Sequence, residues 1–307
     1  MIKPARTWRA WLVYDRERAE KNADYIRMHK QIGRTFGFDF ELKMIEETGL
    51  DISRLPDFAI VRTVRPGFSR KLESLGVPVF NNSFVADICN DKGKTIAYIS
   101  SHSDVPVVPT SRFFNRELSG GLLARHPDSV IKAVDGHGGS QVFYTKEPYE
   151  RIAQGLGASD FVIQPFIDGP GKDIRIYVVG NEIAGAVERT AENGFRANYS
   201  LGAKVRRYIP DKETAGQVYQ LCRLFSFGLA GIDFLVARDG RLLLSEIEDV
   251  VGARMLYRCN PDAALLERYF AFIRDKLLRS RPFMGIIGSE MDDRKRAGME
   301  DADESRY

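Results

Sequence analysis

Apolar and polar residues alternate in short blocks over the first 90 residues, in the order expected of a small α/β unit. An apolar and aromatic run at 8–14 predicts a strand. Apolar positions at helical spacing follow over 16–36, and Gly37 is a suitable helix stop. A helix at 65–75, opened by Pro66, and three more strands are expected, the strands at 38–45, 58–61 and 77–80. This alternation predicts an open, mainly parallel sheet that binds ligands at the carboxyl ends of its strands.

The pattern becomes mixed after residue 90. Beyond a helix at 92–101, we expect strands at 105–110, 130–134, 142–144, 161–166, 173–179, 182–189 and 204–208. Helices at 211–228 and 261–278 flank a predicted hairpin that turns at Asp239 and Gly240. The sequence thus predicts an α/β (α+β) chain with four parts: an N-terminal α/β unit, a central lobe, a C-terminal lobe and a charged tail, at 1–90, 91–160, 161–282 and 283–307.

Composition narrows the class of protein. The chain has 307 residues, of which 44% are hydrophobic and 28% charged, as in an ordinary globular protein. The formal net charge of +3 gives no reason to expect a nucleic-acid partner. The three cysteines are far apart, and no apolar run approaches the roughly 18 residues of a membrane span. We therefore expect a cytoplasmic protein with no membrane association.

An acidic cluster near the C-terminus is the strongest chemical signal. Asp233 lies in an apolar segment, and Glu246 and Glu248 lie two residues apart on the next predicted strand, so they share one face. A hairpin would bring Asp233 opposite them, and three adjacent carboxylates repel one another unless a cation lies between them. Such oxygen ligands suit Mg²⁺ bound to nucleotide phosphates. The alternative is a solvated sheet edge, which the apolar flanking residues disfavour.

A lysine before a glycine-rich segment is the second signal. Lys132 lies on a predicted strand, and Gly138 and Gly139 follow in the turn. Glycines allow backbone N–H groups to approach phosphate oxygens, and a lysine adds a positive charge. Alone, the pattern is equally consistent with a plain hairpin loop.

Two further segments have chemistry that suits a nucleotide. An apolar strand that runs into an irregular turn can offer backbone groups to a purine, at Gln164, Pro165, Phe166 and Ile167. Asp173 is a candidate partner of a ribose hydroxyl, and Arg196 with Asn198 is a candidate clamp for a γ-phosphate or an acyl phosphate. Taken singly, each segment is more consistent with a turn or a surface ion pair.

The order of the motifs carries more information than any one of them. Along the chain they read N-D-K, K-x(5)-G-G, Q-P-F-I, D-I-R, F-R-x-N, A-G-I-D and E-I-E-D-x-x-G. Over about residues 76–260 this order resembles the ATP-grasp superfamily, specifically its RimK-like branch of glutamate and other carboxylate–amine ligases. The resemblance implies an ATP-grasp fold, in which an open parallel-sheet N-terminal domain precedes two α+β lobes that sandwich ATP.

The resemblance also implies roles for single residues. Lys92 and Lys132 would bind phosphates beneath the loop of Gly138 and Gly139. The adenine would lie along Gln164, Pro165, Phe166 and Ile167, and Asp173 would contact the nucleotide. Arg196 and Asn198 would lie near the transferred phosphate. Asp233, Glu246 and Glu248 would hold two Mg²⁺ ions. Glu248 stands where the family usually has asparagine. The glutamate adds negative charge, so Mn²⁺ is an alternative to Mg²⁺ as the preferred ion.

The implied activity is an ATP-dependent ligation of a small carboxylate to an amine, through an acyl phosphate. Arg254, just past the acidic motif, is a candidate catalytic group. Arg62, Arg65 and Arg175 are candidates for holding a substrate carboxylate. Leu201 departs from the arginine found in ribosomal-protein ligases of this branch, so the acceptor is not specified. A cyclising synthetase, a phosphotransferase and a non-catalytic nucleotide-binding or coat-associated protein remain alternatives, and the oligomeric state is left open.

Overall fold

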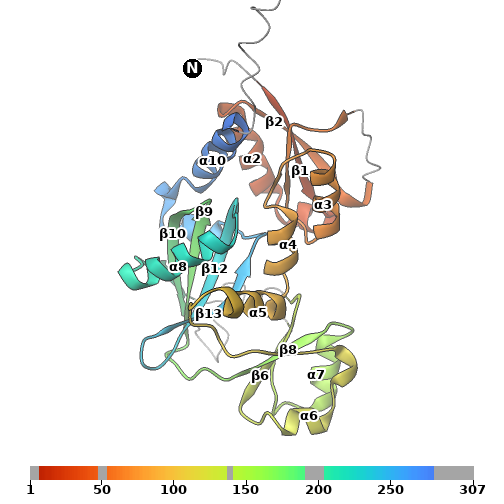
Figure 1. The fold of residues 1–307 in the computed structure, drawn as a ribbon, viewed down its shortest axis with the longest axis vertical. Coiled ribbons are helices and arrows are strands. Elements are labelled where there is room, and N and C mark those ends of the chain that lie inside the picture. Colours follow the sequence, from red (N-terminus) through yellow and green to blue (C-terminus); the bar gives the residue numbers. More distant parts are fainter. Residues whose placement is uncertain (1–6, 48–53, 137–140, 191–203, 280–307) are drawn as a thin grey trace, which may run out of the picture.

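The computed structural model describes residues 7–47, 54–136, 141–190 and 204–279. The strands are β1 (Trp8–Tyr14), β2 (Phe38–Met44), β3 (Phe58–Val61), β4 (Val79–Phe80), β5 (Ser111–Phe113), β6 (Ser129–Ala133), β7 (Val142–Tyr144), β8 (Phe161–Pro165), β9 (Lys172–Val179), β10 (Glu182–Thr190), β11 (Lys204–Arg207), β12 (Leu229–Val236) and β13 (Leu242–Glu248). The α-helices are α1 (Arg16–Lys21), α2 (Ala23–Thr35), α3 (Pro66–Ser74), α4 (Ser83–Cys89), α5 (Lys92–His102), α6 (Gly120–Ala124), α7 (Tyr149–Leu156), α8 (Lys212–Leu224), α9 (Arg254–Cys259) and α10 (Leu265–Arg279). Figure 1 shows them in three units along the long axis of the molecule.

The N-terminal unit is a parallel sheet in the order β2-β1-β3-β4, which confirms the predicted open sheet. The single helix predicted over 16–36 is wrong, because the structure has two helices that meet at Asn22. Asn22 leaves helical geometry, at φ −119° and ψ 23°, and its side chain donates a hydrogen bond to the carbonyl of Arg18. Asparagine competes in this way for backbone hydrogen bonds, so it favours a helix end.

Two antiparallel sheets form the rest of the chain. The larger has the order β11-β10-β9-β12-β13, and the smaller has the order β5-β8-β6-β7. Apolar side chains of α5 and α8 cover one face of the larger sheet, and those of α6 and α7 cover one face of the smaller. Figure 1 shows the smaller sheet at the far end from the N-terminal unit.

The predicted boundary between the lobes at 160/161 is wrong. Strand β8 pairs with β5 and β6, so it belongs to the smaller sheet, and the chain enters the larger sheet only at β9. Helix α5, expected in the central lobe, packs instead on the larger sheet. The strand expected over 105–110 is also absent. Only Val107 bridges to Leu244, because the flanking Pro106 and Pro109 have no N–H to donate.

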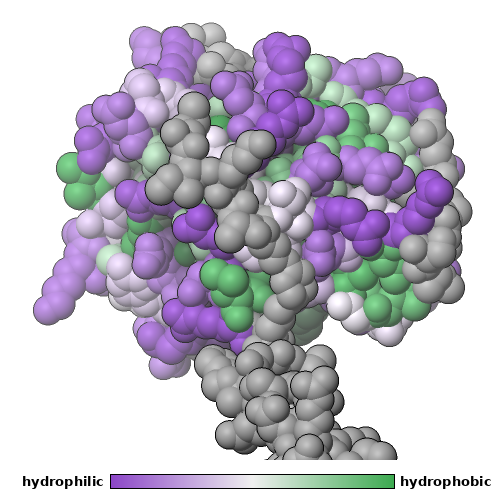
Figure 2. Space-filling view, turned by 90° about the horizontal axis from the view of Figure 1, so that it is seen from above, coloured by the Kyte–Doolittle hydropathy of each residue, from purple (hydrophilic) through white to green (hydrophobic). Residues whose placement is uncertain are grey.

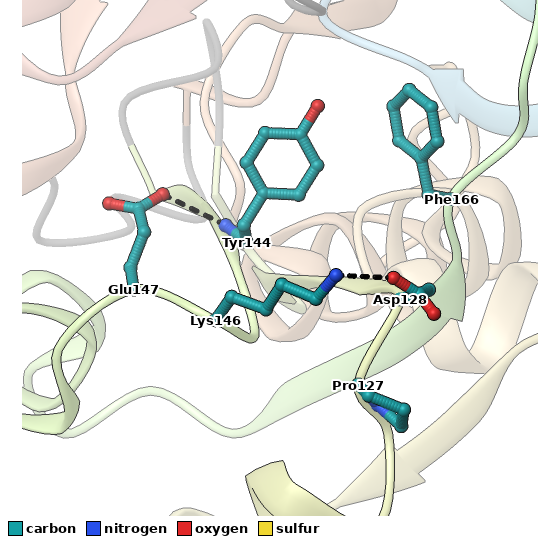
Figure 3. Close-up of a pocket in the computed structure, with 6 residues that line it drawn as sticks. All are labelled: Pro127, Asp128, Tyr144, Lys146, Glu147 and Phe166. Carbon is teal, nitrogen blue, oxygen red and sulfur yellow. Dashed lines mark hydrogen bonds and ion pairs between the residues drawn. The ribbon is translucent and has the colours of Figure 1, made fainter.

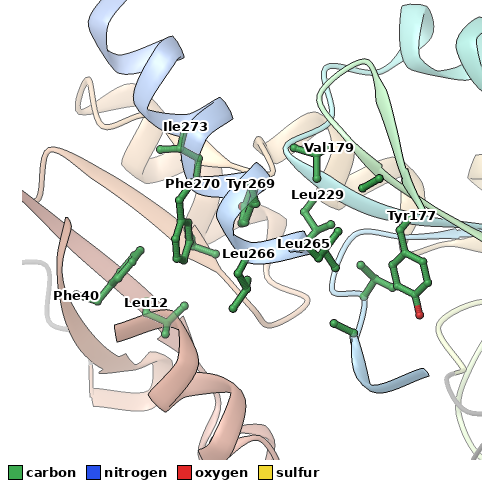
Figure 4. Close-up of a cluster of buried hydrophobic side chains, with 14 of the residues drawn as sticks. Leu12, Phe40, Tyr177, Val179, Leu229, Leu265, Leu266, Tyr269, Phe270 and Ile273 are labelled. Carbon is green, nitrogen blue, oxygen red and sulfur yellow. The ribbon is translucent and has the colours of Figure 1, made fainter. Parts of the chain in front are cut away.

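A shared hydrophobic core joins the N-terminal unit to the larger sheet. Helix α10 lies between them, and Figure 4 shows its Phe270 and Ile273 beside Leu12 and Phe40 of the first sheet. The same cluster continues through Leu265 and Leu266 of α10 to Val179 and Leu229 of the larger sheet. Close packing of this kind resists relative movement, so the two sheets hold a fixed arrangement.

The surface at the N-terminal end is mostly polar. Figure 2 shows charged and polar side chains over most of this face, with apolar side chains in small groups. Within the described residues, no helix is both long enough and apolar enough to cross a bilayer.

Asn81 connects the end of β4 to both ends of the β12–β13 hairpin. Its Nδ2 donates to the carbonyls of Leu229 and Asp249, at 2.8 and 3.1 Å. Its Oδ1 accepts from the backbone N–H groups of Gly228 and Leu229, at 2.6 and 3.1 Å. All four bonds are buried, so one side chain satisfies backbone groups that water does not reach.

We predict that Asn81→Ala lowers the free energy of unfolding by about 2–4 kcal/mol, because it leaves buried backbone groups without partners. Urea denaturation followed by fluorescence measures this change. Asn22→Ala, which removes one half-exposed hydrogen bond, is the control and should cost less than about 1 kcal/mol. Equal effects of the two variants would contradict the role assigned to Asn81.

Candidate active site

Three carboxylates meet on one face of the β12–β13 hairpin. In the register of the two strands, Asp233 lies opposite Glu246 and Gly231 lies opposite Glu248, with an irregularity after Asp233. Each side chain offers one oxygen, and these oxygens all lie within 4.8 Å of one another. Asp233 is buried, and the two glutamates are partly exposed. The structure therefore brings together the acidic residues that the sequence analysis grouped.

Two buried arginines supply cations to this cluster. The Nε and Nη2 of Arg175 donate to the two oxygens of Asp233, at 2.7 and 2.6 Å, and Nη2 also reaches Glu248 at 2.7 Å. From the neighbouring strand, Nη2 of Arg189 donates to Asp233 at 2.7 Å, while its Nε donates to Asp173. The mutual repulsion of the carboxylates is thus already balanced, in part, by side chains of the protein.

This network corrects one sequence-based expectation and qualifies another. Arg175 was a candidate for holding a substrate carboxylate, but it is buried and engaged by Asp233 and Glu248. Asp173 was a candidate for the ribose, yet its carboxylate pairs with Arg189. The sequence analysis also missed Arg189. Arg189 lies opposite Asp173 in the β9–β10 pair, and this pairing identifies it as part of the network.

Burial and charge act in opposite directions on these groups. Burial alone would raise the pKa of Asp233, but Arg175 and Arg189 outweigh burial and hold that pKa well below its ordinary value. Burial opposes the charge of Glu246 as well, and Lys92 nevertheless lowers the pKa of Glu246. Burial raises the pKa of Glu248, against the effect of Arg175. Asp233 and Glu246 are therefore ionised at neutral pH, and the all-oxygen set fits a hard divalent cation such as Mg²⁺.

Two lysines approach the carboxylates from different elements. Lys92 is the first residue of α5, and its Nζ lies 3.0 Å from Oε2 of Glu246. The same Nζ donates to the carbonyl of Gly136, at 2.6 Å, at the start of the glycine-rich segment. Lys132 projects from β6 of the smaller lobe. Burial lowers the pKa of Lys132 to about 8, against the attraction of Glu246. Positive charges from both lobes thus lie around one carboxylate.

Several predicted residues lie outside the described part of the chain. These are Gly138, Gly139, Arg196 and Asn198, together with Leu201.

The segment 164–167 lies beside a pocket of about 400 Å³ in the smaller lobe. Gln164 is buried, Pro165 and Phe166 are exposed, and Ile167 is half-buried. Figure 3 shows Tyr144 and Phe166 on the same side of the pocket, above the ion pair of Lys146 and Asp128. The ring centroids of Tyr144 and Phe166 are 5.6 Å apart. Two aromatic side chains thus give an apolar surface next to the segment expected to bind a purine.

The candidate substrate arginines lie in different environments. Arg62 follows β3 and is only 5% exposed. Its Nη2 donates to the carbonyl of Val251 at 2.8 Å, while its Nε has no hydrogen-bond partner among the residues that the structure describes. Arg65 is exposed and donates to the carbonyl of Val64, at 3.2 Å. Arg254 is exposed at the first residue of α9. Of the three, Arg62 is the buried cation with an unused donor.

Comparison with known proteins agrees with this geometry. Residues 123–266 match the family model of the RimK-like ATP-grasp domain. This segment of the chain is therefore similar to the RimK-like ATP-grasp domain. This finding accounts for the two α+β lobes, for the acidic hairpin and for the lysine on the strand before the glycine-rich segment.

Relatives and solved structures extend the likeness beyond the matched segment. An uncharacterised protein of Mycoplasma genitalium is 24% identical over 278 residues, covering 87% of this chain and 89% of that protein. The α-aminoadipate–LysW ligase of Saccharolobus solfataricus is 28% identical over 199 residues, covering 62% of this chain and 72% of the relative. The crystal structure of a D-alanine–D-alanine ligase from Bacillus anthracis with ATP has a TM-score of 0.69 at 18% identity, covering 89% and 98% of the two chains. The ATP-grasp fold therefore includes the N-terminal unit.

We predict that Arg189→Met destabilises the protein by about 3–5 kcal/mol, because it leaves buried carboxylates without one of their cations. Urea denaturation gives the free energy of unfolding. Arg206→Met is the matched control on β11, since Arg206 is exposed and pairs with Glu188 at 2.7 Å. The control should lose far less stability, because an ion pair of an exposed arginine contributes little. A small, equal loss in both variants would contradict the account.

Proposed function

We propose that the protein is an ATP-dependent carboxylate–amine ligase, which forms an amide bond through an acyl phosphate and releases ADP and phosphate. One observation carries this proposal. Carboxylates of β12 and β13 lie together, Lys92 of α5 contacts Glu246 among them at 3.0 Å, and Lys132 of β6 interacts electrostatically with the same glutamate. Transfer of a γ-phosphoryl group needs both carboxylates and lysines. The carboxylates hold divalent cations, and these cations and the lysines neutralise the phosphate oxygens while the nucleophile approaches.

Asp233, Glu246 and Glu248 would hold two Mg²⁺ ions against the phosphates. The ions would supply neutralisation of the phosphate charge during transfer. The protein's own contribution is orientation. Arg175 fixes Asp233 through two hydrogen bonds and keeps it ionised, and Lys92 ties Glu246 to the start of the glycine-rich segment. A site that is oriented before ATP binds loses little free energy to rearrangement during reaction.

The remaining proposed contacts follow the two lobes. Lys132 would contact the phosphates, and the segment from Gln164 to Ile167 would lie along the base, with Phe166 and its pocket beside it. Arg196, Asn198 and Arg254 are proposed to act on the acyl phosphate. Asp173 acts in this proposal through Arg189, which it orients toward Asp233.

We assign Arg62 to an anionic group of the carboxylate substrate, which is an amino acid or a peptide-like molecule. Among the described residues its neighbours include the carbonyl of Val251 and the ring of Tyr25, 5.2 Å away, and a buried guanidinium without an ionised partner is costly unless an anion joins it. Arg62 also lies at the switch point of the first sheet, between β1 and β3, where ligands of open sheets bind. Its partner Val251 follows the acidic strand, and Tyr177 donates to the next carbonyl, that of Gly252, at 3.2 Å. The position therefore adjoins the proposed reaction centre.

We predict that Asp233→Asn and Glu246→Gln each lower ADP formation by at least about 100-fold, because a required ligand of the cations is lost. The assay is a screen of amino acids and small carboxylates in the presence of ATP and Mg²⁺, with hydroxylamine to trap an acyl phosphate. Asp239→Asn, an exposed residue of the hairpin turn, is the control and should retain full activity.

Undiminished turnover in both variants would remove the metal assignment. Consumption of a second substrate identifies a ligase, whereas ADP release with one substrate identifies a cyclising synthetase or a phosphotransferase.

We predict that Arg62→Gln raises the KM for the carboxylate substrate by about 10- to 100-fold, since a charge-assisted hydrogen bond is lost. The dissociation constant for ATP should be unchanged. Arg65→Gln tests an exposed arginine three residues away and should leave KM within about twofold. An unchanged KM in Arg62→Gln, with the fold intact by circular dichroism, would exclude this role.

A further inference from the structure

A chain of two hydrogen bonds fixes the side-chain amide of Gln164. Thr110 Oγ1 donates to the carbonyl of Val108 at 2.7 Å. Gln164 Nε2 donates to the same Oγ1 at 2.8 Å. A hydroxyl has one proton to give, and here the carbonyl accepts it, so the hydroxyl must accept from the amide. The NH₂ group of Gln164 is thereby held toward Thr110.

The same two hydrogen bonds disfavour the opposite orientation of the Gln164 side-chain amide. Turning Gln164 over would place Oε1 against Thr110, and two acceptors would then compete for one hydroxyl proton. The observed orientation leaves Oε1 pointing away from Thr110. This atom is buried and has no hydrogen-bond partner in the described part of the chain, and the residue is only 2% exposed. A buried acceptor without a partner costs free energy, so the site is built for a ligand or solvent donor.

The pleat of the smaller sheet places Gln164 between the proposed phosphate and base regions. Gln164 lies opposite Val130, and Lys132 lies two residues further along the same strand. Paired residues and alternate residues share a face, so Lys132 and Gln164 project from one face. The opposite face carries Ile131 and Ile163, which pack against α6 and α7. Phe166, two residues after Gln164, leads to the aromatic pocket of Figure 3.

We propose that Thr110 is a positioning residue that makes the site selective for a 6-amino purine. It holds Gln164 so that Oε1 accepts a hydrogen bond from the amino group of adenine. A 6-oxo purine would present its own acceptor to Oε1, and the amide cannot turn to donate while Thr110 holds it. This inference rests on the proposed function, because it assumes that a nucleotide occupies the cleft.

Paired binding measurements test the inference. Dissociation constants for ATP and for ITP are measured by calorimetry in the presence of Mg²⁺; ITP has a 6-oxo group and no 2-amino group. The full-length protein should prefer ATP by about 100-fold or more, since a mismatched buried acceptor is strongly rejected. Thr110→Val keeps the shape of the side chain and removes the hydroxyl, which frees the amide. The preference should then fall to about 10-fold or less.

Three further variants distinguish the positioning of Gln164 by Thr110 from a general loss of structure in the lobe. Thr145→Val removes another buried hydroxyl of the same lobe, which donates to the carbonyl of His126 at 2.6 Å, and should keep the wild-type preference. Thr110→Ser retains the hydroxyl and should also keep the wild-type preference for ATP. Adding Gln164→Glu to Thr110→Val should restore the preference, because a carboxylate presents only acceptors.

An unchanged ATP preference in Thr110→Val, with wild-type thermal unfolding, would overturn the inference while leaving the ligase proposal intact. So would loss of the preference in Thr110→Ser. Failure of the unmodified protein to bind either nucleotide would instead overturn the proposed function, and this inference with it.

Discussion

The buried ionic network of Asp233 with Arg175 and Arg189 is the interaction on which the rest of the site depends. It joins three neighbouring strands of the larger sheet, because Arg175 lies on β9, Arg189 on β10 and Asp233 on β12. Isolated charges at this depth would be prohibitive, whereas hydrogen-bonded pairs are tolerated. The network therefore holds Asp233 ionised and in a fixed position. Glu248 is attached to the same network through Arg175.

The other parts of the fold bring groups to this fixed point. Helix α5 begins at Lys92, so its packing on the larger sheet sets the lysine against Glu246. The smaller sheet brings Lys132 and Gln164 on one face. Helix α10 joins the N-terminal unit to the larger sheet through one core, and this packing holds Arg62 beside the loop that follows the acidic strand. Each contribution comes from a separate element, so a family of ligases can change substrates while keeping the charged centre.

Local patterns predicted much of the fold and the acidic cluster. Period-two alternation and the turn at Asp239 and Gly240 are short-range signals, and they were enough to predict that Asp233 lies across the hairpin from Glu246, with Glu248 on the same face. Long-range pairing was not predictable from such signals. The pairing of β8 (Phe161–Pro165) with β6 and the ion pair of Arg175 with Asp233 did not show in the local pattern, because these partners lie far away in sequence. Short helices such as α4, α6 and α9 were missed because they span two turns or fewer.

In the proposed function, the acidic hairpin binds divalent cations together with a triphosphate. A crystal of the protein with Mn²⁺ and a non-hydrolysable ATP analogue tests it directly, because anomalous scattering locates the manganese. The account predicts peaks within about 2.0–2.4 Å of carboxylate oxygens of Asp233, Glu246 and Glu248, with phosphate oxygens completing the coordination. Bound analogue without a manganese peak at these residues, with Arg175 still joining Asp233 to Glu248, would contradict it.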